Sequence, residues 1–205
     1  MPTLLSWNVA GAAHDRLDAV ASFVRGVAPD LLLLQEAVED SRRLTSILGG
    51  DVRFVPAFPR SGGVPGATAE GMALWSPTGL HDVESAALGG WPWPRVALRC
   101  RVGRLAVCNL HLSHLPWQRQ AQLRAAAAHP ARPLLLAGDF NRPGGARLAG
   151  FRAVVPSGWS FRCGPLGLRL DAALASPGVA VTAATYLTSG VSDHRPMLLT
   201  VAADV

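Results

Sequence analysis

Eight polar side chains lie at or just after the ends of apolar, strand-like segments, and their types can do chemistry. They are Asn8, Glu36, His111, Asp139, Asn141, Asp171, Asp193 and His194. Any one of them alone fits a cap or a turn, because Asn and Asp favour turns. Several of them together at strand ends indicate a site, since loops carried by a rigid scaffold are where folds place functional groups.

These side chains suit a hard divalent cation beside a phosphate. Carboxylate and amide oxygens match Mg²⁺ or Mn²⁺, and Glu36 with Asn8 fits the few protein ligands that Mg²⁺ takes. A histidine backed by a carboxylate is a tuned base or an electrostatic stabiliser. Two histidines and a metal would neutralise the charge of a phosphorane-like transition state. Because neither a Gly-x-Ser-x-Gly elbow nor a Gly-Lys phosphate loop occurs, direct attack of water at phosphorus is the simplest mechanism.

The elements that must position these groups follow from the apolar pattern. Neighbouring side chains of a strand point to opposite faces, so Asp193 and His194 can share a site only from a loop at a strand end. A hairpin of 95–101 and 104–111 places Asn109 and His111 on one face. The other expected strands are 3–9, 31–34, 52–58, 70–76, 133–137, 169–174, 179–182 and 197–201, and the expected helices are 17–27, 41–48 and 118–129. This mixture predicts an α/β sandwich in a single domain over 1–205.

Composition points to a globular protein with an anionic partner. The chain is 49% hydrophobic and only 16% charged, and its net charge is +5. All 19 basic residues are Arg, which favours forked recognition of phosphate, although a composition bias would also explain it. Three cysteines, Cys100, Cys108 and Cys163, predict reduced thiols in the cytoplasm, and the hairpin places the first two on opposite faces. The start of the sequence leaves no room for a targeting segment, and no apolar run approaches a membrane span.

The motifs resemble those of the endonuclease/exonuclease/phosphatase superfamily, the group that includes proteins like deoxyribonuclease I and exonuclease III. Six segments occur in family order, and they are Ser6-Trp7-Asn8, Leu33-Leu34-Gln35-Glu36, Asn109-Leu110-His111-Leu112, Ala137-Gly138-Asp139-Phe140-Asn141, Leu170-Asp171 and Ser192-Asp193-His194-Arg195-Pro196. They span nearly the whole chain. The resemblance implies a four-layer α/β/β/α sandwich, in which two mixed, mostly antiparallel sheets pack face to face with helices outside.

The resemblance also implies metal and phosphate contacts. Glu36 and Asn8 would hold Mg²⁺ or Mn²⁺, with Asp193 as a further ligand. His111 would donate a hydrogen bond to a non-bridging phosphate oxygen. Glu70 occupies the place where several members carry an acidic residue near that histidine, although its own motif is a loose match.

The same resemblance implies the catalytic groups. His194, oriented by Asp171, would be the general base that activates water, but some members credit Asp139 with that step, and both alternatives stay open. Asn141 would position the phosphate.

Two departures bear on the substrate. Abasic-site nucleases of this superfamily use a tyrosine in the middle of the chain, whereas the only tyrosine here is Tyr186, which disfavours that subfamily. Trp91 and Trp93 lie in a Pro-rich loop, where they could stack on bases, cover a lipid headgroup or cap a sheet edge. We count both tryptophans, Arg195 and Glu70 among the expected substrate contacts.

We therefore expect a metal-dependent phosphodiesterase that acts as a nuclease on DNA or RNA, and is a monomer with no protein partner. One alternative is a phosphatase or phospholipase-like hydrolase of a small phosphorylated metabolite or a lipid headgroup. The second is a protein that binds nucleic acid without catalysis.

Overall fold

Two six-stranded sheets form the centre of the structure, a computed structural model that describes residues 1–205 except 13–14, 59–69, 93 and 204–205. The strands of the first sheet are, in spatial order, β13 (Val179–Tyr186), β14 (Met197–Ala203), β1 (Thr3–Asn8), β2 (Leu31–Val38), β4 (Glu70–Ser76) and β3 (Asp51–Phe58). Those of the second are β5 (His81–Gly89), β6 (Arg95–Val102), β7 (Leu105–His111), β8 (Leu134–Asp139), β12 (Asp171–Ala175) and β9 (Arg152–Val154).

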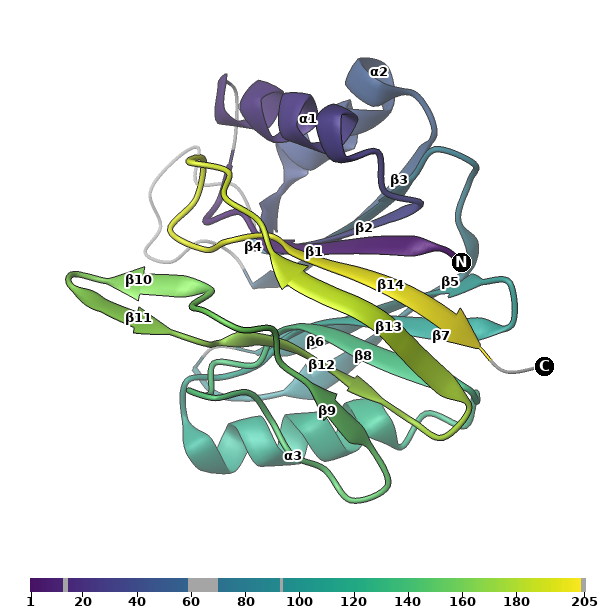
Figure 1. The fold of residues 1–205 in the computed structure, drawn as a ribbon, viewed down its shortest axis with the longest axis vertical. Coiled ribbons are helices and arrows are strands. Elements are labelled where there is room, and N and C mark those ends of the chain that lie inside the picture. The colour runs from purple at the N-terminus through teal and green to yellow at the C-terminus, as the bar shows by residue number, and fades with distance from the viewer. Residues whose placement is uncertain (13–14, 59–69, 93, 204–205) are drawn as a thin grey trace.

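The sheets pack face to face, with helices on their outer faces (Figure 1). The helices are α1 (Asp15–Val27), the short 3-10 helix η1 (Glu39–Arg43), α2 (Leu44–Leu48) and α3 (Pro116–Ala127). Helices α1 and α2 lie over the first sheet and α3 over the second (Figure 1). The expected four-layer sandwich is confirmed.

Alternation along the buried strands explains these layers. Leu31 and Leu33 of β2 belong to the core between the sheets, whereas Leu32 and Leu34 pack with the residues of α1. A four-leucine run is what a strand buried on both faces requires. The run Leu134–Leu136 of β8 divides in the same way, between the central core and the α3 side.

Each sheet has a single parallel pair among its described strands, and both pairs are βαβ units. Helix α1 joins β1 to β2, and α3 joins β7 to β8, while the remaining neighbours are antiparallel. In open α/β sheets, ligands bind beyond the carboxyl ends of parallel strands. The fold therefore brings two such ends together, one from each sheet.

Several local predictions are confirmed and others are wrong. The β6–β7 hairpin forms, with Cys100 on the inter-sheet face and Cys108 on the α3 face. The expected helix 41–48 is instead η1 followed by α2. Strand β5 was not predicted, because it is a largely exposed edge strand whose residues show no apolar alternation.

The remaining unpredicted strands are very short. They are β9 and the hairpin of β10 (Phe161–Cys163) and β11 (Leu166–Leu168). Three-residue strands give no periodic signal. Among the described residues, no helix has the length and apolar character needed to cross a membrane.

Candidate active site

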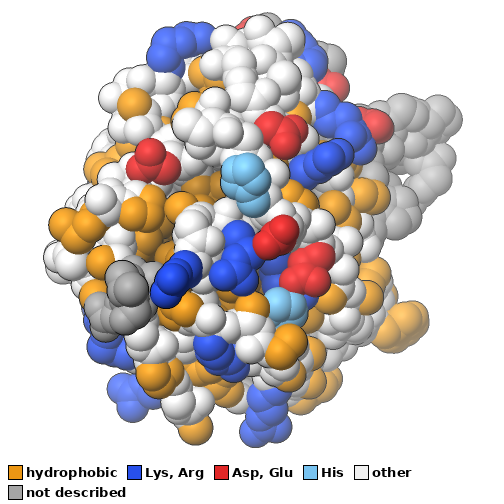
Figure 2. Space-filling view, turned by 90° about the vertical axis from the view of Figure 1, so that its right-hand side faces the viewer, with side chains coloured by type: hydrophobic (Ala, Val, Ile, Leu, Met, Phe, Trp, Pro, Cys, Tyr) orange, Lys and Arg blue, Asp and Glu red, His pale blue; other side chains and the backbone are white. Residues whose placement is uncertain are grey.

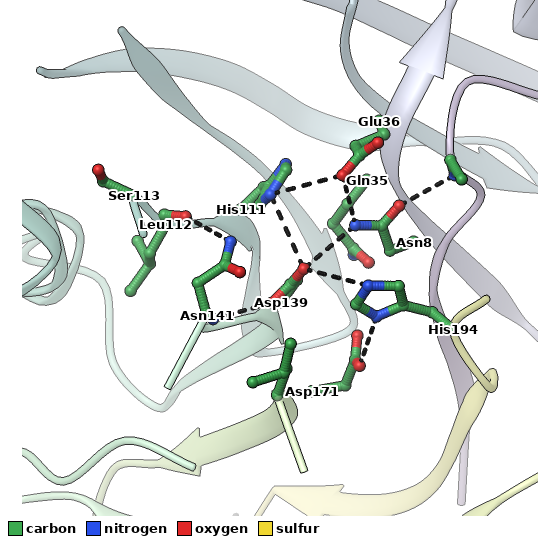
Figure 3. A network of polar contacts seen from close by, with 12 residues as sticks. Asn8, Gln35, Glu36, His111, Leu112, Ser113, Asp139, Asn141, Asp171 and His194 are labelled. Carbon is green, nitrogen blue, oxygen red and sulfur yellow. Dashed lines mark hydrogen bonds and ion pairs between the residues drawn. The ribbon is translucent and has the colours of Figure 1, made fainter. Parts of the chain in front are cut away.

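The polar groups meet beyond the carboxyl ends of the two parallel pairs. Asn8 ends β1, while His111 ends β7 and is the cross-strand partner of Asp139 at the end of β8. Glu36 lies on a bulge of β2, with a left-handed φ of +50°. This bulge interrupts the alternation of the strand and turns the Glu36 side chain toward Asn8 and His111 (Figure 3).

Asp139 is the centre of the network. Its Oδ2 accepts a hydrogen bond from Nδ2 of Asn8 at 3.1 Å, and it lies 3.7 Å from Nε2 of His111 and 3.8 Å from Nε2 of His194 (Figure 3). The same amide nitrogen of Asn8 donates to Oε1 of Glu36 at 2.9 Å. This carboxylate, only 1% exposed, thus contacts Asn8 and both histidines, and Glu36 joins the network through Asn8 and His111.

Asn141 is held beside Asp139 by two hydrogen bonds. Its backbone N–H donates to Oδ1 of Asp139 at 2.8 Å, and its side-chain nitrogen donates to the carbonyl of Leu112 at 2.8 Å. It has a left-handed φ of +49°, a conformation that Asn tolerates better than most residues. The second hydrogen of its amide nitrogen remains available for an anionic ligand.

His194 and Asp171 form a buried charged pair. Nδ1 of His194 lies 2.8 Å from Oδ2 of Asp171, and both residues are buried. Burial alone would lower the pKa of His194, but the hydrogen bond and charge of Asp171, followed by the charges of Asp139 and Asp193, raise it from 6.5 to about 9. Without a metal, the ring is therefore cationic at neutral pH.

The pKa of Asp139 is raised above that of an ordinary carboxyl group. Burial, followed by the charge of its cross-strand partner Asp171, raises the pKa of Asp139, although His194 and the hydrogen bonds from Asn141 and Asn8 counteract part of this rise. A carboxylate with a raised pKa binds a proton more readily at neutral pH than an exposed one does.

His111 differs from His194 in both partner and charge. Its Nδ1 lies 3.2 Å from Nη1 of Arg95, a buried residue that the sequence did not bring to attention. Burial, followed by the positive charges of Arg95, His114 and His194, lowers the pKa of His111 well below 6.5. The ring is therefore neutral at physiological pH.

A cavity of about 360 Å³ opens at this network. Its lining residues are Ala10, Glu36, His114, Asp139, Asn141, Pro143, Phe161, Leu168, Leu170, Asp193 and His194. The hairpin β10–β11 supplies an apolar wall, and the ring of Phe161 lies 4.7 Å from that of His194. The cavity thus has a polar floor beside a surface suited to an uncharged group.

Of the other expected site residues, only some line this cavity. Asp193 is exposed and lines the cavity. The guanidinium of Arg195 stacks on Trp159 at 3.5 Å, so it does not line the cavity. Trp91 is 83% exposed in the β5–β6 loop. Trp93 lies outside the described residues.

A second cavity, of about 390 Å³, lies at the opposite end of the strands. Figure 2 shows acidic, basic and histidine side chains gathered on this face. They pair with each other, because Glu84 lies 2.5 Å from His129 and Asp82 lies 3.6 Å from Arg101. We therefore assign the chemistry to the smaller cavity.

The donor groups beside the smaller cavity, of which Glu36 lines it, fit a hard divalent cation. Glu36, Glu70 and His111 present ligand atoms within 4.8 Å of one another. Glu36 and Asp139 converge on one nitrogen of Asn8, which stands between two carboxylates.

A second group of the same kind adjoins the first. Asp139, Asp171 and His194 also lie within 4.8 Å of one another, and these two are the only such groups in the parts of the chain that are described. Asp193 belongs to neither group. Oδ1 of Asn8 accepts from the backbone of Ala10, so ligation through this oxygen stays a prediction.

The comparisons agree with this geometry. Two face-to-face sheets with carboxylate, amide and imidazole groups at their parallel ends define a phosphoester hydrolase of the metal-dependent type. A model of the Endonuclease/Exonuclease/phosphatase family matches residues 5–194. The chain belongs to this family. A search of curated proteins found no match.

Solved structures share the fold at low identity. The endonuclease/exonuclease/phosphatase of Bacteroides vulgatus is 16% identical with a TM-score of 0.76, covering 99% of each chain. The mannosyl-6-phosphatase of Bacteroides thetaiotaomicron is 16% identical with a TM-score of 0.74, covering 98% of this chain and 100% of its own. The human Nocturnin catalytic domain, with bound sulfate, is 18% identical with a TM-score of 0.70, covering 98% and 94%.

Three polar residues were missed as parts of the site or its support. Arg95 closes the Pro-rich loop and starts the predicted hairpin that ends at His111, but only the tryptophans of that loop were interpreted. Gln35 and Asn109 are fully buried between the sheets, where Nε2 of Gln35 donates to Oδ1 of Asn109 at 2.7 Å. Both occur in the family motifs, so that signal could have found them.

Proposed function

We propose that this protein is a divalent-metal-dependent phosphodiesterase that cleaves nucleic acid by direct attack of water at phosphorus. One observation carries the proposal, namely the convergence of Asp139 with both histidines, Asn8 and the bulged Glu36 at the ends of the two parallel pairs. We place Mg²⁺ or Mn²⁺ at Glu36, with Asn8 and Asp193 as further candidates for ligands.

The perturbed pKa values of Asp139 and His194 favour different catalytic roles for these two residues. Asp139, with its raised pKa, accepts the proton of the attacking water. His194 is cationic and directs Nε2 toward Asp139, where it stabilises negative charge on the phosphate in the transition state. For His194 to act as the base, it must first lose its own proton. A bound divalent cation would neutralise phosphate charge and lower the pKa of nearby groups.

The charge of the cavity supports a diester substrate. Of the described residues that line it, none is Arg, and three are acidic. A phosphodiester carries one negative charge and a monoester close to two, so a lining poor in fixed cations suits the diester. The apolar wall at Phe161, Leu168 and Leu170 can receive an uncharged part of the esterified group.

Basic and aromatic side chains in the first turns of α3 support nucleic acid. Arg119 donates to the backbone carbonyl of Asn141, and burial together with the charge of Arg142 lowers the pKa of Arg119. Trp117, 70% exposed, precedes Arg119 on α3. Arginines that contact flanking phosphates and an aromatic side chain that stacks on a base are the usual elements of single-strand binding. The free cysteines are compatible with the cytoplasmic location we propose.

The test compares substrates under one set of conditions. Purified protein with Mn²⁺ or Mg²⁺ is assayed on bis(p-nitrophenyl) phosphate, p-nitrophenyl phosphate, plasmid and single-stranded DNA, in parallel with EDTA and with His194→Ala. We expect diester and DNA cleavage that both controls abolish, while His81→Ala, which removes an exposed histidine far from the cavity, retains activity. Cleavage of the monoester alone would show that the protein is a phosphatase and not a phosphodiesterase. Metal-independent DNA binding without turnover would replace it by a binding protein.

A further inference from the structure

The two ring nitrogens of His111 have different surroundings. Nδ1 lies 3.2 Å from Nη1 of Arg95, while Nε2 lies 3.7 Å from Oδ2 of Asp139 and 3.8 Å from Oε1 of Glu36. The ring is 4% exposed, so solvent does not decide which nitrogen carries the proton. Arg95 is the residue that decides it.

A guanidinium has five N–H donors and no acceptor. The contact between Arg95 and Nδ1 of His111 is therefore a hydrogen bond only if Nδ1 is unprotonated and accepts. The neutral ring then carries its single proton at Nε2. We propose that Arg95 is a positioning residue that fixes His111 in the Nε2–H form and directs this N–H toward a substrate oxygen. The destination of the N–H rests on the proposed function, whereas the tautomer does not.

The N–H at Nε2 is kept for a ligand. Distances of 3.7 and 3.8 Å to Asp139 and Glu36 are too long for hydrogen bonds. Among the described residues, Nε2 of His111 is buried without any hydrogen-bond partner. A buried donor without an acceptor is destabilising, so its retention is explained by an oxygen that arrives with the substrate.

This assignment restricts how a metal can bind. A protonated Nε2 has no lone pair to offer, and Nδ1 faces Arg95. Glu36, Glu70 and His111 form a group with metal-like spacing, but His111 in this tautomer would not be a ligand, and a cation would have to be held by Glu36 without it. His111 would thus donate to the phosphate from a position separate from that of a cation held by Glu36.

Arg95 can hold this position because acidic groups surround it. The residue is 5% exposed at the start of β6. Burial lowers the pKa of Arg95, while the charges of Glu70, Asp139 and Glu36 raise it. Since an arginine stays protonated at physiological pH, it remains a permanent donor to His111.

The direct test is the protonation of the ring nitrogens, which needs no substrate. Protein labelled with ¹⁵N-histidine is examined by long-range ¹H–¹⁵N correlation spectroscopy, with and without saturating Mg²⁺, and the loss of signals in His111→Gln assigns the ring. We expect Nε2 protonated and Nδ1 unprotonated in both states. A proton on Nδ1, or a Mg²⁺-induced loss of the proton at Nε2, would overturn the proposal.

Variants test the part played by Arg95. Arg95→Met should shift the Nδ1 signal of His111 and lower kcat at least about tenfold, with KM changed less than about threefold. Arg95→Lys, which restores a charged donor, should recover part of both effects. Arg99→Met removes an equally buried arginine from the same strand and should leave the His111 signals and kcat unchanged.

The outcomes separate this proposal from the proposed function. An Arg95→Met protein with an unshifted Nδ1 signal, or with an unchanged kcat, would overturn the role of Arg95 while the phosphodiesterase assignment stands. A wild-type protein that cleaves no phosphate ester would overturn the function, and the spectra would still decide the tautomer.

Discussion

Replacement of Asp171 by Asn perturbs the buried charged pair with His194. Asp171 is fully buried, and its Oδ2 lies 2.8 Å from Nδ1 of His194. Burial lowers the pKa of His194, but Asp171, with help from Asp139 and Asp193, overcomes this effect and raises the pKa from 6.5 to about 9. With a neutral Asn in place of Asp171, we expect the pKa of His194 to lose most of that rise.

The raised pKa makes the free energy of unfolding depend on pH. A group whose folded-state pKa exceeds its unfolded-state value stabilises the fold below the unfolded pKa, and this stabilisation is lost as the pH rises through the folded pKa. For His194 the window runs from 6.5 to about 9. The difference between these two values corresponds to roughly 3 kcal/mol at most. For a chain of this length, that amounts to a shift in Tm of about 6 to 12 °C.

The assay is urea unfolding in EDTA at several pH values between about 6 and 10, for wild type and Asp171→Asn. Tryptophan fluorescence reports on the site, because the buried indole of Trp7 donates to the backbone carbonyl of His194 at 3.1 Å. We expect the stability advantage of the wild type to shrink by up to roughly 3 kcal/mol across the window.

The control is Asp18→Asn, which neutralises an exposed carboxylate on α1 and should follow the wild-type pH profile. A constant difference between wild type and Asp171→Asn over the whole range would refute the reasoning, because it would mean that Asp171 does not raise the pKa of His194.

Two further variants, each with a matched control, test the metal ligand Glu36 and the close approach of the backbone at Gly138. Glu36→Gln should raise the Mg²⁺ concentration needed for half-maximal activity at least about tenfold. Glu39→Gln, which changes an exposed carboxylate in η1, should leave that concentration unchanged. If both variants give the same Mg²⁺ titration, Glu36 is not a metal ligand. Gly138→Ala should destabilise the fold by more than about 2 kcal/mol in urea unfolding, because Gly138 has a φ of +144° and a Cβ would collide with the carbonyl of Leu110. In the control Gly26→Ala, in α1, the added Cβ has no atom nearby, and the variant should be more stable by up to about 1 kcal/mol. A loss of stability in this control would mean that the effect of Gly138→Ala cannot be attributed to the collision with Leu110.

The layers of the fold could be predicted because they depend on pattern and motif. The run Leu31–Leu34 is apolar at every position, which is what a strand buried on both faces requires. Strand β5 could not be predicted, since an exposed edge strand held mainly by pairing with β6 carries little pattern of its own.

The members of the site could be predicted, but not their charge states. Residue type marks Asp139, Asp171 and His194 as candidates, yet the cationic state of His194 depends on carboxylates from separate segments that meet only in three dimensions. The predicted hairpin already brings the start of β6, at Arg95, near the end of β7, at His111, but the hydrogen bond between the two side chains depends on their orientation in the folded structure.

The most direct test of the central claim is hydrolysis of bis(p-nitrophenyl) phosphate in H₂¹⁸O with Mn²⁺, followed by mass spectrometry of both products. Direct attack of water at phosphorus predicts one ¹⁸O in the phosphate-containing product and none in p-nitrophenol, with turnover abolished by EDTA and by His194→Ala. Label in p-nitrophenol, or turnover that persists with EDTA, would contradict the account.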